Sequence, residues 1–119
     1  MAAPPLSHHE ILALAAPFAR AGRHVDLAAT QRQERRVAFR PVELPAEAGQ
    51  PALRDGLLLE SFGTGTFRLT RTLTSLDDGL RATVQGLGQD PGALLAQVLA
   101  VEPRRPFRRG EGYALALSF

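Results

Sequence analysis

The sequence predicts an α+β domain in which a curved antiparallel sheet carries helices. Three observations lead to this fold class. Residues 57–86 alternate apolar and polar side chains with the period of a half-buried strand. Helix-capping patterns begin at Ser7 and at Asp90. The 119 residues, 45% of them hydrophobic, suit one domain with one core, which we place at 1–119.

The expected order is an N-terminal helix, a curved meander of five to six strands, a second helix over about 90–102 packed on the sheet, and a final strand. The last strand reaches Phe119 without a polar tail. That pattern favours an N-terminal module of a longer protein.

The first helix begins after Ser7, a good N-cap residue, and Glu10 completes a capping box three residues later. Pro17 predicts a kink or an end to the regular helix, and Gly22 predicts its termination. A buried stripe at helical spacing consists of Ile11, Leu14, Ala15 and Phe18.

Two candidate strands follow, over 24–29 and 35–42, and they predict a hairpin. Residues 41–52 contain three prolines and little periodicity, so they predict a surface connection or an edge crossing. The apolar residues that would face one another across the hairpin are Val25, Leu27, Val37 and Phe39.

The meander predicts two further hairpins. The first sets Leu59 opposite Leu69, Leu57 opposite Arg71, and Glu60 beside Arg68 as an exposed cross-strand ion pair.

The second hairpin turns at residues 75–79 and pairs Leu69 with Val84. Arg71 breaks the inward apolar pattern. It is a candidate polar anchor at the mouth of a pocket, or a residue near an edge that extends its charge to solvent.

The second helix has Asp90 as its N-cap and Pro91 at its first position, and Pro103 stops it. Its leucines and valines form a broad apolar face. The final strand covers residues 113–119, where large apolar side chains alternate with small ones.

Composition excludes several kinds of chemistry. All 14 basic residues are arginine, and the chain has no cysteine. A lysine Schiff base, a P-loop lysine, a thiol nucleophile and a thiolate metal site are therefore impossible. The residue bias is typical of a GC-rich bacterial genome. No apolar run approaches the roughly 20 residues of a membrane helix, and we expect a cytoplasmic protein that does not bind membranes.

Motifs for catalysis or metal binding are incomplete. His24 and Asp26 have the spacing of two iron ligands on one strand face, but a third ligand would have to come from His8 or His9. A zincin-like helix start lacks its second histidine, because Ala13 stands there. We expect no metal and no cofactor, and an enzyme using His24 and Asp26 is the least favoured hypothesis.

Arginine provides the remaining signal. Four guanidiniums crowd the loop before the final strand and could hold an anion or a partner: Arg104, Arg105, Arg108 and Arg109. Arg68 and Arg81 would extend this basic surface onto the sheet. Nucleic acid is not favoured as a partner, because the strands carry no interleaved aromatic residues for base stacking.

The leading functional hypothesis is a non-catalytic binding or protein-interaction module. It would use an open sheet edge, for a protein partner or a homodimer, or the Arg-rich loop. The alternative is a small-ligand or anion-binding domain with a pocket between the curved sheet and the second helix.

Overall fold

The computed structural model describes residues 6–26, 35–107 and 116–118. The elements in chain order are α1 (His8–Arg20), β1 (Arg36–Ala38), β2 (Val42–Leu44), β3 (Leu53–Ser61), β4 (Phe67–Ser75), β5 (Arg81–Gly88), α2 (Pro91–Leu99), the 3-10 helix η2 (Arg105–Phe107) and β6 (Ala116–Ser118).

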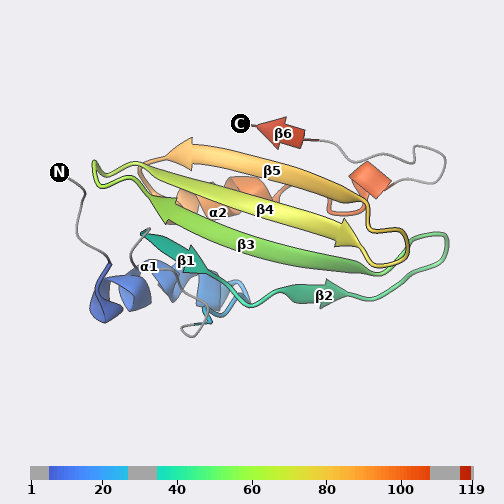
Figure 1. Cartoon of the computed structure of the whole chain (residues 1–119), viewed down its shortest axis with the longest axis horizontal. Coiled ribbons are helices and arrows are strands. Elements are labelled where there is room, and N and C mark those ends of the chain that lie inside the picture. Colours follow the sequence, from blue (N-terminus) through green and yellow to red (C-terminus); the bar gives the residue numbers. More distant parts are fainter. Residues whose placement is uncertain (1–5, 27–34, 108–115, 119) are drawn as a thin grey trace.

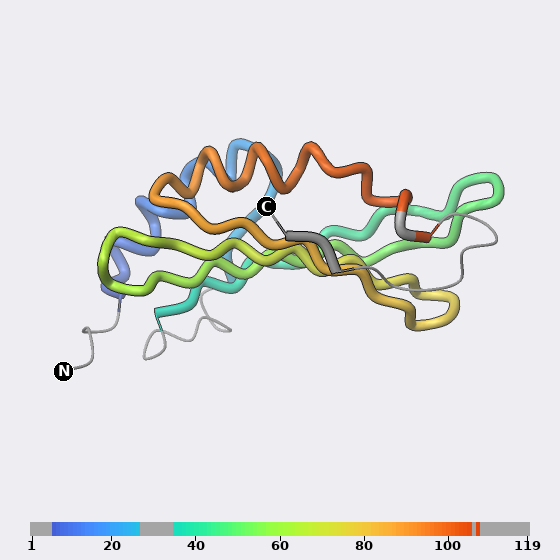
Figure 2. Tube along the Cα trace, turned by 90° about the horizontal axis from the view of Figure 1, so that it is seen from above, coloured from blue at the N-terminus to red at the C-terminus, as the bar shows by residue number. Residues whose placement is uncertain are grey.

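The strands form one open sheet. β3, β4 and β5 make an antiparallel meander, β1 and β2 pair along the same side of β3, and β6 pairs with β5 (Figure 1). Both α-helices lie on one face, so the molecule has two layers (Figure 2). The predicted α+β class, with an N-terminal helix, an antiparallel sheet and a second helix packed on it, is confirmed.

α1 begins as predicted. The Ser7 side chain accepts a hydrogen bond from the Glu10 backbone at 3.1 Å, and the Glu10 carboxylate accepts one from the Ser7 backbone at 3.2 Å. These bonds lower the pKa of Glu10 below its ordinary value. The helix continues through Pro17 to Arg20, and Gly22 follows with a φ of 82°, which favours glycine.

The register of the meander is partly as predicted. Leu59 lies opposite Leu69, and Glu60 lies opposite Arg68. In the second hairpin, however, Leu69 faces Gly86 instead of Val84, a shift of two residues. Because side chains alternate with a period of two, both registers place the same residues on the same faces. The turn decides between them: it spans residues 76–80, one position later than predicted.

Three further details differ from the sequence-based expectation. Residues 41–52 contain the short strand β2. The predicted 24–29 strand is represented by a single bridge between Val25 and Phe39, while Leu27 lies outside the described residues. The final strand is described only at 116–118, and it runs parallel to β5. The helix between the two strands, α2, runs back along one face of the sheet (Figure 2).

The core lies between the sheet and the helices. The ring of Phe18 stacks on that of Phe39 with 4.3 Å between centroids, which joins α1 to the sheet. At Gly86 and Gly88 a Cβ atom would come within 3.2 Å of Leu94, so the two glycines allow α2 to approach β5 closely. The main cluster also contains Ile11, Val37, Leu57, Leu59, Leu69, Val84, Leu95 and Val98.

A second, smaller apolar cluster lies at the opposite end of the sheet. Phe107 of η2 covers it, and its other buried members are Leu53, Leu73 and Ala82. The sheet therefore has apolar cover on its helix side at both ends.

Candidate interaction surface

Charged side chains on the helix side of the sheet form a buried cluster. Asp55 is 0% exposed, and its carboxylate accepts hydrogen bonds from Nε and Nη2 of Arg71 at 3.0 and 2.8 Å. Arg23, which follows α1, donates to the backbone carbonyl of Asp55 at 3.1 Å and also pairs with its carboxylate. Each Asp55 carboxylate oxygen is thus held by at least one guanidinium.

Arg71 also reaches the end of α2. Its Nη1 donates to the carbonyls of Val98 and Val101, both at 3.0 Å. These acceptors carry the partial negative charge of a helix C-terminus, which offsets the second guanidinium of the cluster. Arg71 was predicted as a candidate pocket anchor, and the structure places it in the middle of the central strand, where it connects the sheet to α2.

No helix among the described residues covers the opposite face of the sheet (Figure 2). Side chains stand there in rows across the strands. The rows at the two ends contain the arginines, and three of the seven residues in the rows between them are threonine. The rows are Glu43, Arg54, Thr74 and Arg81; Gly56, Thr72 and Thr83; Ala38, Leu58, Thr70 and Gln85; and Arg36, Glu60, Arg68 and Leu87.

The last row lies beside the β3–β4 turn, and together with Phe62 of that turn we call it the hairpin-end patch (Arg36, Glu60, Phe62, Arg68 and Leu87). Glu60 receives Nε and Nη2 of Arg68, both at 2.8 Å, and lies 3.5 Å from Arg36. The predicted ion pair between Glu60 and Arg68 is therefore present, but it is exposed only on the arginine side, because Glu60 is 8% exposed.

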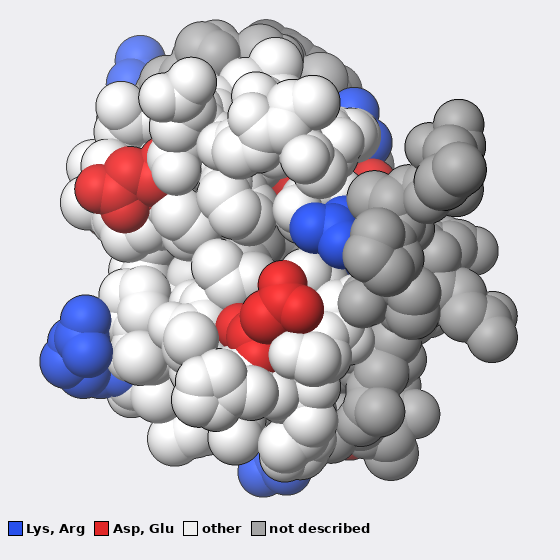
Figure 3. Space-filling view, turned by 90° about the vertical axis from the view of Figure 1, so that its left-hand side faces the viewer, with Lys and Arg blue, Asp and Glu red and all other residues white. Residues whose placement is uncertain are grey.

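Two large apolar side chains in the hairpin-end patch are exposed. Leu87 is 62% exposed and Phe62 is 48% exposed, and the Arg68 guanidinium lies 5.4 Å from the Phe62 ring centroid. The end of the molecule that carries the β3–β4 turn has separated charged groups on a mostly uncharged surface (Figure 3). Sequence reasoning missed both residues. The signal for Leu87 was a large apolar side chain at an outward position of β5.

Arg68 and Arg81 share this face but stand at its opposite ends. Arg81 pairs with Thr74, six residues from Arg68 along β4, which separates the two by about 20 Å. Asp77 and Asp78 lie in the turn before Arg81, and the Asp78 carboxylate accepts a hydrogen bond from the Leu80 backbone at 3.0 Å. The two arginines therefore do not form one basic site.

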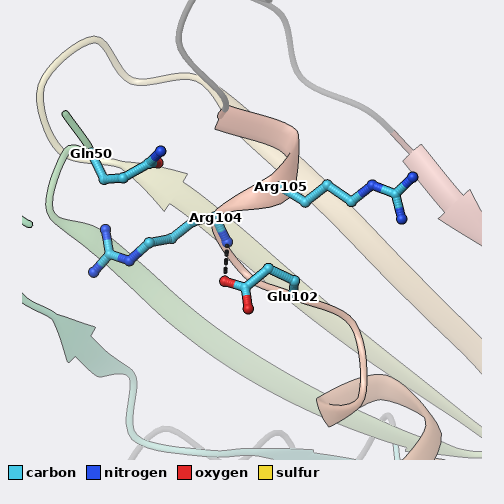
Figure 4. Close-up of a pocket in the computed structure, with 4 residues that line it drawn as sticks. All are labelled: Gln50, Glu102, Arg104 and Arg105. Carbon is cyan, nitrogen blue, oxygen red and sulfur yellow. Dashed lines mark hydrogen bonds between the residues drawn. The ribbon is translucent and has the colours of Figure 1, made fainter. Parts of the chain in front are cut away.

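The described part of the Arg-rich loop does not converge on one point. Arg104 donates to the carbonyls of Pro45 and Pro51, which ties the loop to the β2–β3 connection. Arg104 and Arg105 both line an open hollow of about 250 Å³, together with Gln50 and Glu102, but their side chains extend in opposite directions (Figure 4). Arg108 and Arg109 lie outside the described residues. Anion binding by this loop stays a prediction.

The candidate metal ligands do not assemble. Among the described residues, which include His8, His9, His24 and Asp26, no three side chains of the metal-binding types gather around one point. His24 instead contributes its backbone carbonyl, which accepts a hydrogen bond from the Arg40 amide at 2.6 Å.

The two edges of the sheet differ in their cover. Outside β1, the Asp26 amide donates to the Ala38 carbonyl at 3.2 Å, and Pro41 and Pro45 flank β2. Prolines of this kind discourage further strand pairing. At the other edge, no described residue pairs with the outer side of β6.

Comparisons of the chain with known protein families, curated proteins and solved structures found no match. Within the described ranges, no helix is both long enough and apolar enough to cross a membrane.

Proposed function

We propose that this protein is a non-catalytic protein-interaction module of a bacterial, cytoplasmic protein, and that it binds an extended segment of a partner at the β6 edge of its sheet. The observation that carries the proposal is the difference between the two edges. Strand addition uses the backbone donors and acceptors of an outer strand. The outer side of β6 lacks a partner within the described part of the chain, whereas bonded segments and prolines protect the β1–β2 edge.

The positions of the acidic groups also support binding over catalysis. Asp55 is held by two guanidiniums, Glu10 belongs to a helix cap, and Asp78 supports a turn. Each of these carboxylates has a structural contact that fixes it. A general acid or base needs a group that can exchange a proton with a substrate.

Selection of binders from a random-peptide display library, followed by mapping of amide chemical shifts in the full chain, tests the proposal. We expect the selected peptides to bind with saturation and to shift the amides of β5 and β6. Binders that shift only residues of α1 or of the β1–β2 edge, or a library that yields no saturable binder, would contradict it.

A pair of proline substitutions provides the matched control. Successive backbone N–H groups of a strand point to opposite sides, so Leu117→Pro and Ser118→Pro each remove a donor from a different side of β6. One of the two is expected to break the pairing of β6 with β5. The other should leave that pairing intact and abolish peptide binding. Survival of binding in both variants would place the binding site elsewhere.

A further inference from the structure

The hairpin-end patch combines features that favour protein contact. Two exposed apolar side chains neighbour Arg68: Phe62 lies 5.4 Å from its guanidinium, and Leu87 is its partner position on β5. Arginine and aromatic residues are enriched among the residues that dominate binding energy at protein interfaces. The patch is also next to the proposed strand-addition edge, because Leu87 belongs to β5, the strand that pairs with β6.

Arg68 has hydrogen-bonding capacity to spare. Its Nε and Nη2 both bond to the same oxygen of Glu60, Oε1. Its Nη1 makes no hydrogen bond with any described residue, and about two fifths of the side chain, 38%, is exposed. A guanidinium in this arrangement can receive an additional carboxylate.

The charges of the patch favour an acidic partner. Arg36 and Arg68 contribute two positive charges, and Glu60 contributes one negative charge. A carboxylate brought by a partner would be attracted to the guanidinium of Arg68, whose side chain is 38% exposed. Phe62 and Leu87 would gain contact area only from a partner that is also apolar, which a free inorganic anion is not.

We propose that the hairpin-end patch sets the specificity of the module by selecting a polypeptide segment in which a carboxylate lies next to large apolar side chains. This inference rests on the proposed function, since it concerns which partner segment the module accepts. The carboxylate bonds to Arg68, and the apolar side chains lie against Phe62 and Leu87.

Amide chemical-shift titration of the full chain tests this specificity with three soluble tripeptides. The probes are acetyl-leucyl-glutamyl-leucinamide and its glutaminyl and lysyl counterparts. We expect the glutamyl peptide to shift the amides of Phe62, Arg68 and Leu87, and to bind about threefold more tightly than the glutaminyl peptide, as exposed ion pairs do. The preference should shrink with added salt, because exposed charges are screened.

Arg68→Gln should remove the preference for the glutamyl peptide. Arg81→Gln is the matched control, because Arg81 is an exposed arginine at an outward position of the same sheet, about 20 Å from Arg68. That variant should keep the preference. Well-dispersed amide spectra of both variants would show that the fold is intact.

Two other results would overturn the inference. One is equal binding of the glutamyl and glutaminyl peptides, and the other is a preference that survives Arg68→Gln. If display-selected peptides still bound at β6 in that case, the proposed function would stand and only the specificity would be wrong. If the glutamyl tripeptide were preferred but no display-selected peptide bound at β6, the specificity of the patch would stand and the proposed function would be wrong.

Discussion

β3 and β4 carry two clusters of the same composition on opposite faces. On the helix side, Asp55 lies between Arg71 and Arg23, and on the uncovered side, Glu60 lies between Arg68 and Arg36. The carboxylate of each cluster comes from β3 and one guanidinium from β4. The clusters differ in their surroundings. A helix end and the core enclose every member of the first, whereas in the second Glu60 is only 8% exposed but solvent reaches both arginines.

This difference separates arginines that serve the structure from arginines that can bind a partner. In the buried cluster every guanidinium nitrogen of Arg71 bonds to a protein acceptor, so little remains for a ligand. Removing one partner of a buried pair leaves a charge without compensation, which is costly. In the second cluster water reaches Arg36 and Arg68 and can replace a lost partner of either guanidinium. These ion pairs therefore contribute less to stability, and the two arginines stay accessible to a binding partner.

Removal of the buried carboxylate should have the largest effect. Asp55→Ala leaves Arg71 and Arg23 enclosed without a counter-charge, and we expect the free energy of unfolding to fall by about 3–5 kcal/mol. Urea denaturation followed by circular dichroism measures this loss. A loss below about 1 kcal/mol would show that the two clusters are equivalent and would remove the basis of the comparison.

Arg23→Ala should have an intermediate effect. Asp55 keeps both bonds from Arg71, so the carboxylate remains paired, and the expected cost is about 1–3 kcal/mol, typical of hydrogen bonds to a charged group. The same denaturation experiment applies. In the double variant Arg23→Ala/Asp55→Ala the two losses should not add, because both substitutions remove the same contact.

Glu60→Gln should have the smallest effect on stability, at about 1 kcal/mol or less, because Arg36 and Arg68 remain hydrated. The difference from the unsubstituted protein should shrink further at high salt, where exposed charges are screened. Denaturation at low and high sodium chloride concentration measures both quantities. A loss that matches that of Asp55→Ala and is insensitive to salt would mean that solvent at Arg36 and Arg68 does not compensate for the loss of the Glu60 carboxylate.

The sequence predicts the uncovered cluster better than the buried one. Glu60 and Arg68 follow from the hairpin register, since both occupy outward positions. Arg71 was recognised as an inward charge, but its partner Asp55 was not, although Asp55 is also an inward residue, two positions from Leu57 on the adjacent strand. Two inward charges of opposite sign on neighbouring strands predict a buried ion pair, so Arg71 could have indicated Asp55 as its partner. Arg23 could not be found in this way, because it reaches the cluster from the segment after α1.

The helix starts and the sheet faces were predictable because each depends on local sequence, as the cap at Ser7 and the cap at Asp90 illustrate. The end of α2 was not, because the helix stops at Leu99, before the predicted stop at Pro103. The pairing of β4 with β5 depends on the turn as well. Alternation alone could not distinguish Gly86 from Val84 as the partner of Leu69, since both choices bury the same side chains.

α2 has no basic residue in its last turn, and a guanidinium from β4 bonds to the carbonyls near its end. A nine-residue segment is too short to hold a helix by itself in water. An excised peptide spanning Pro91–Leu99 should therefore be unstructured, and its helical shape belongs to the assembled domain. Formation of this helix during folding should accordingly depend on the arrival of Arg71, which makes the last turn of α2 a reporter of whether the central strand is in place.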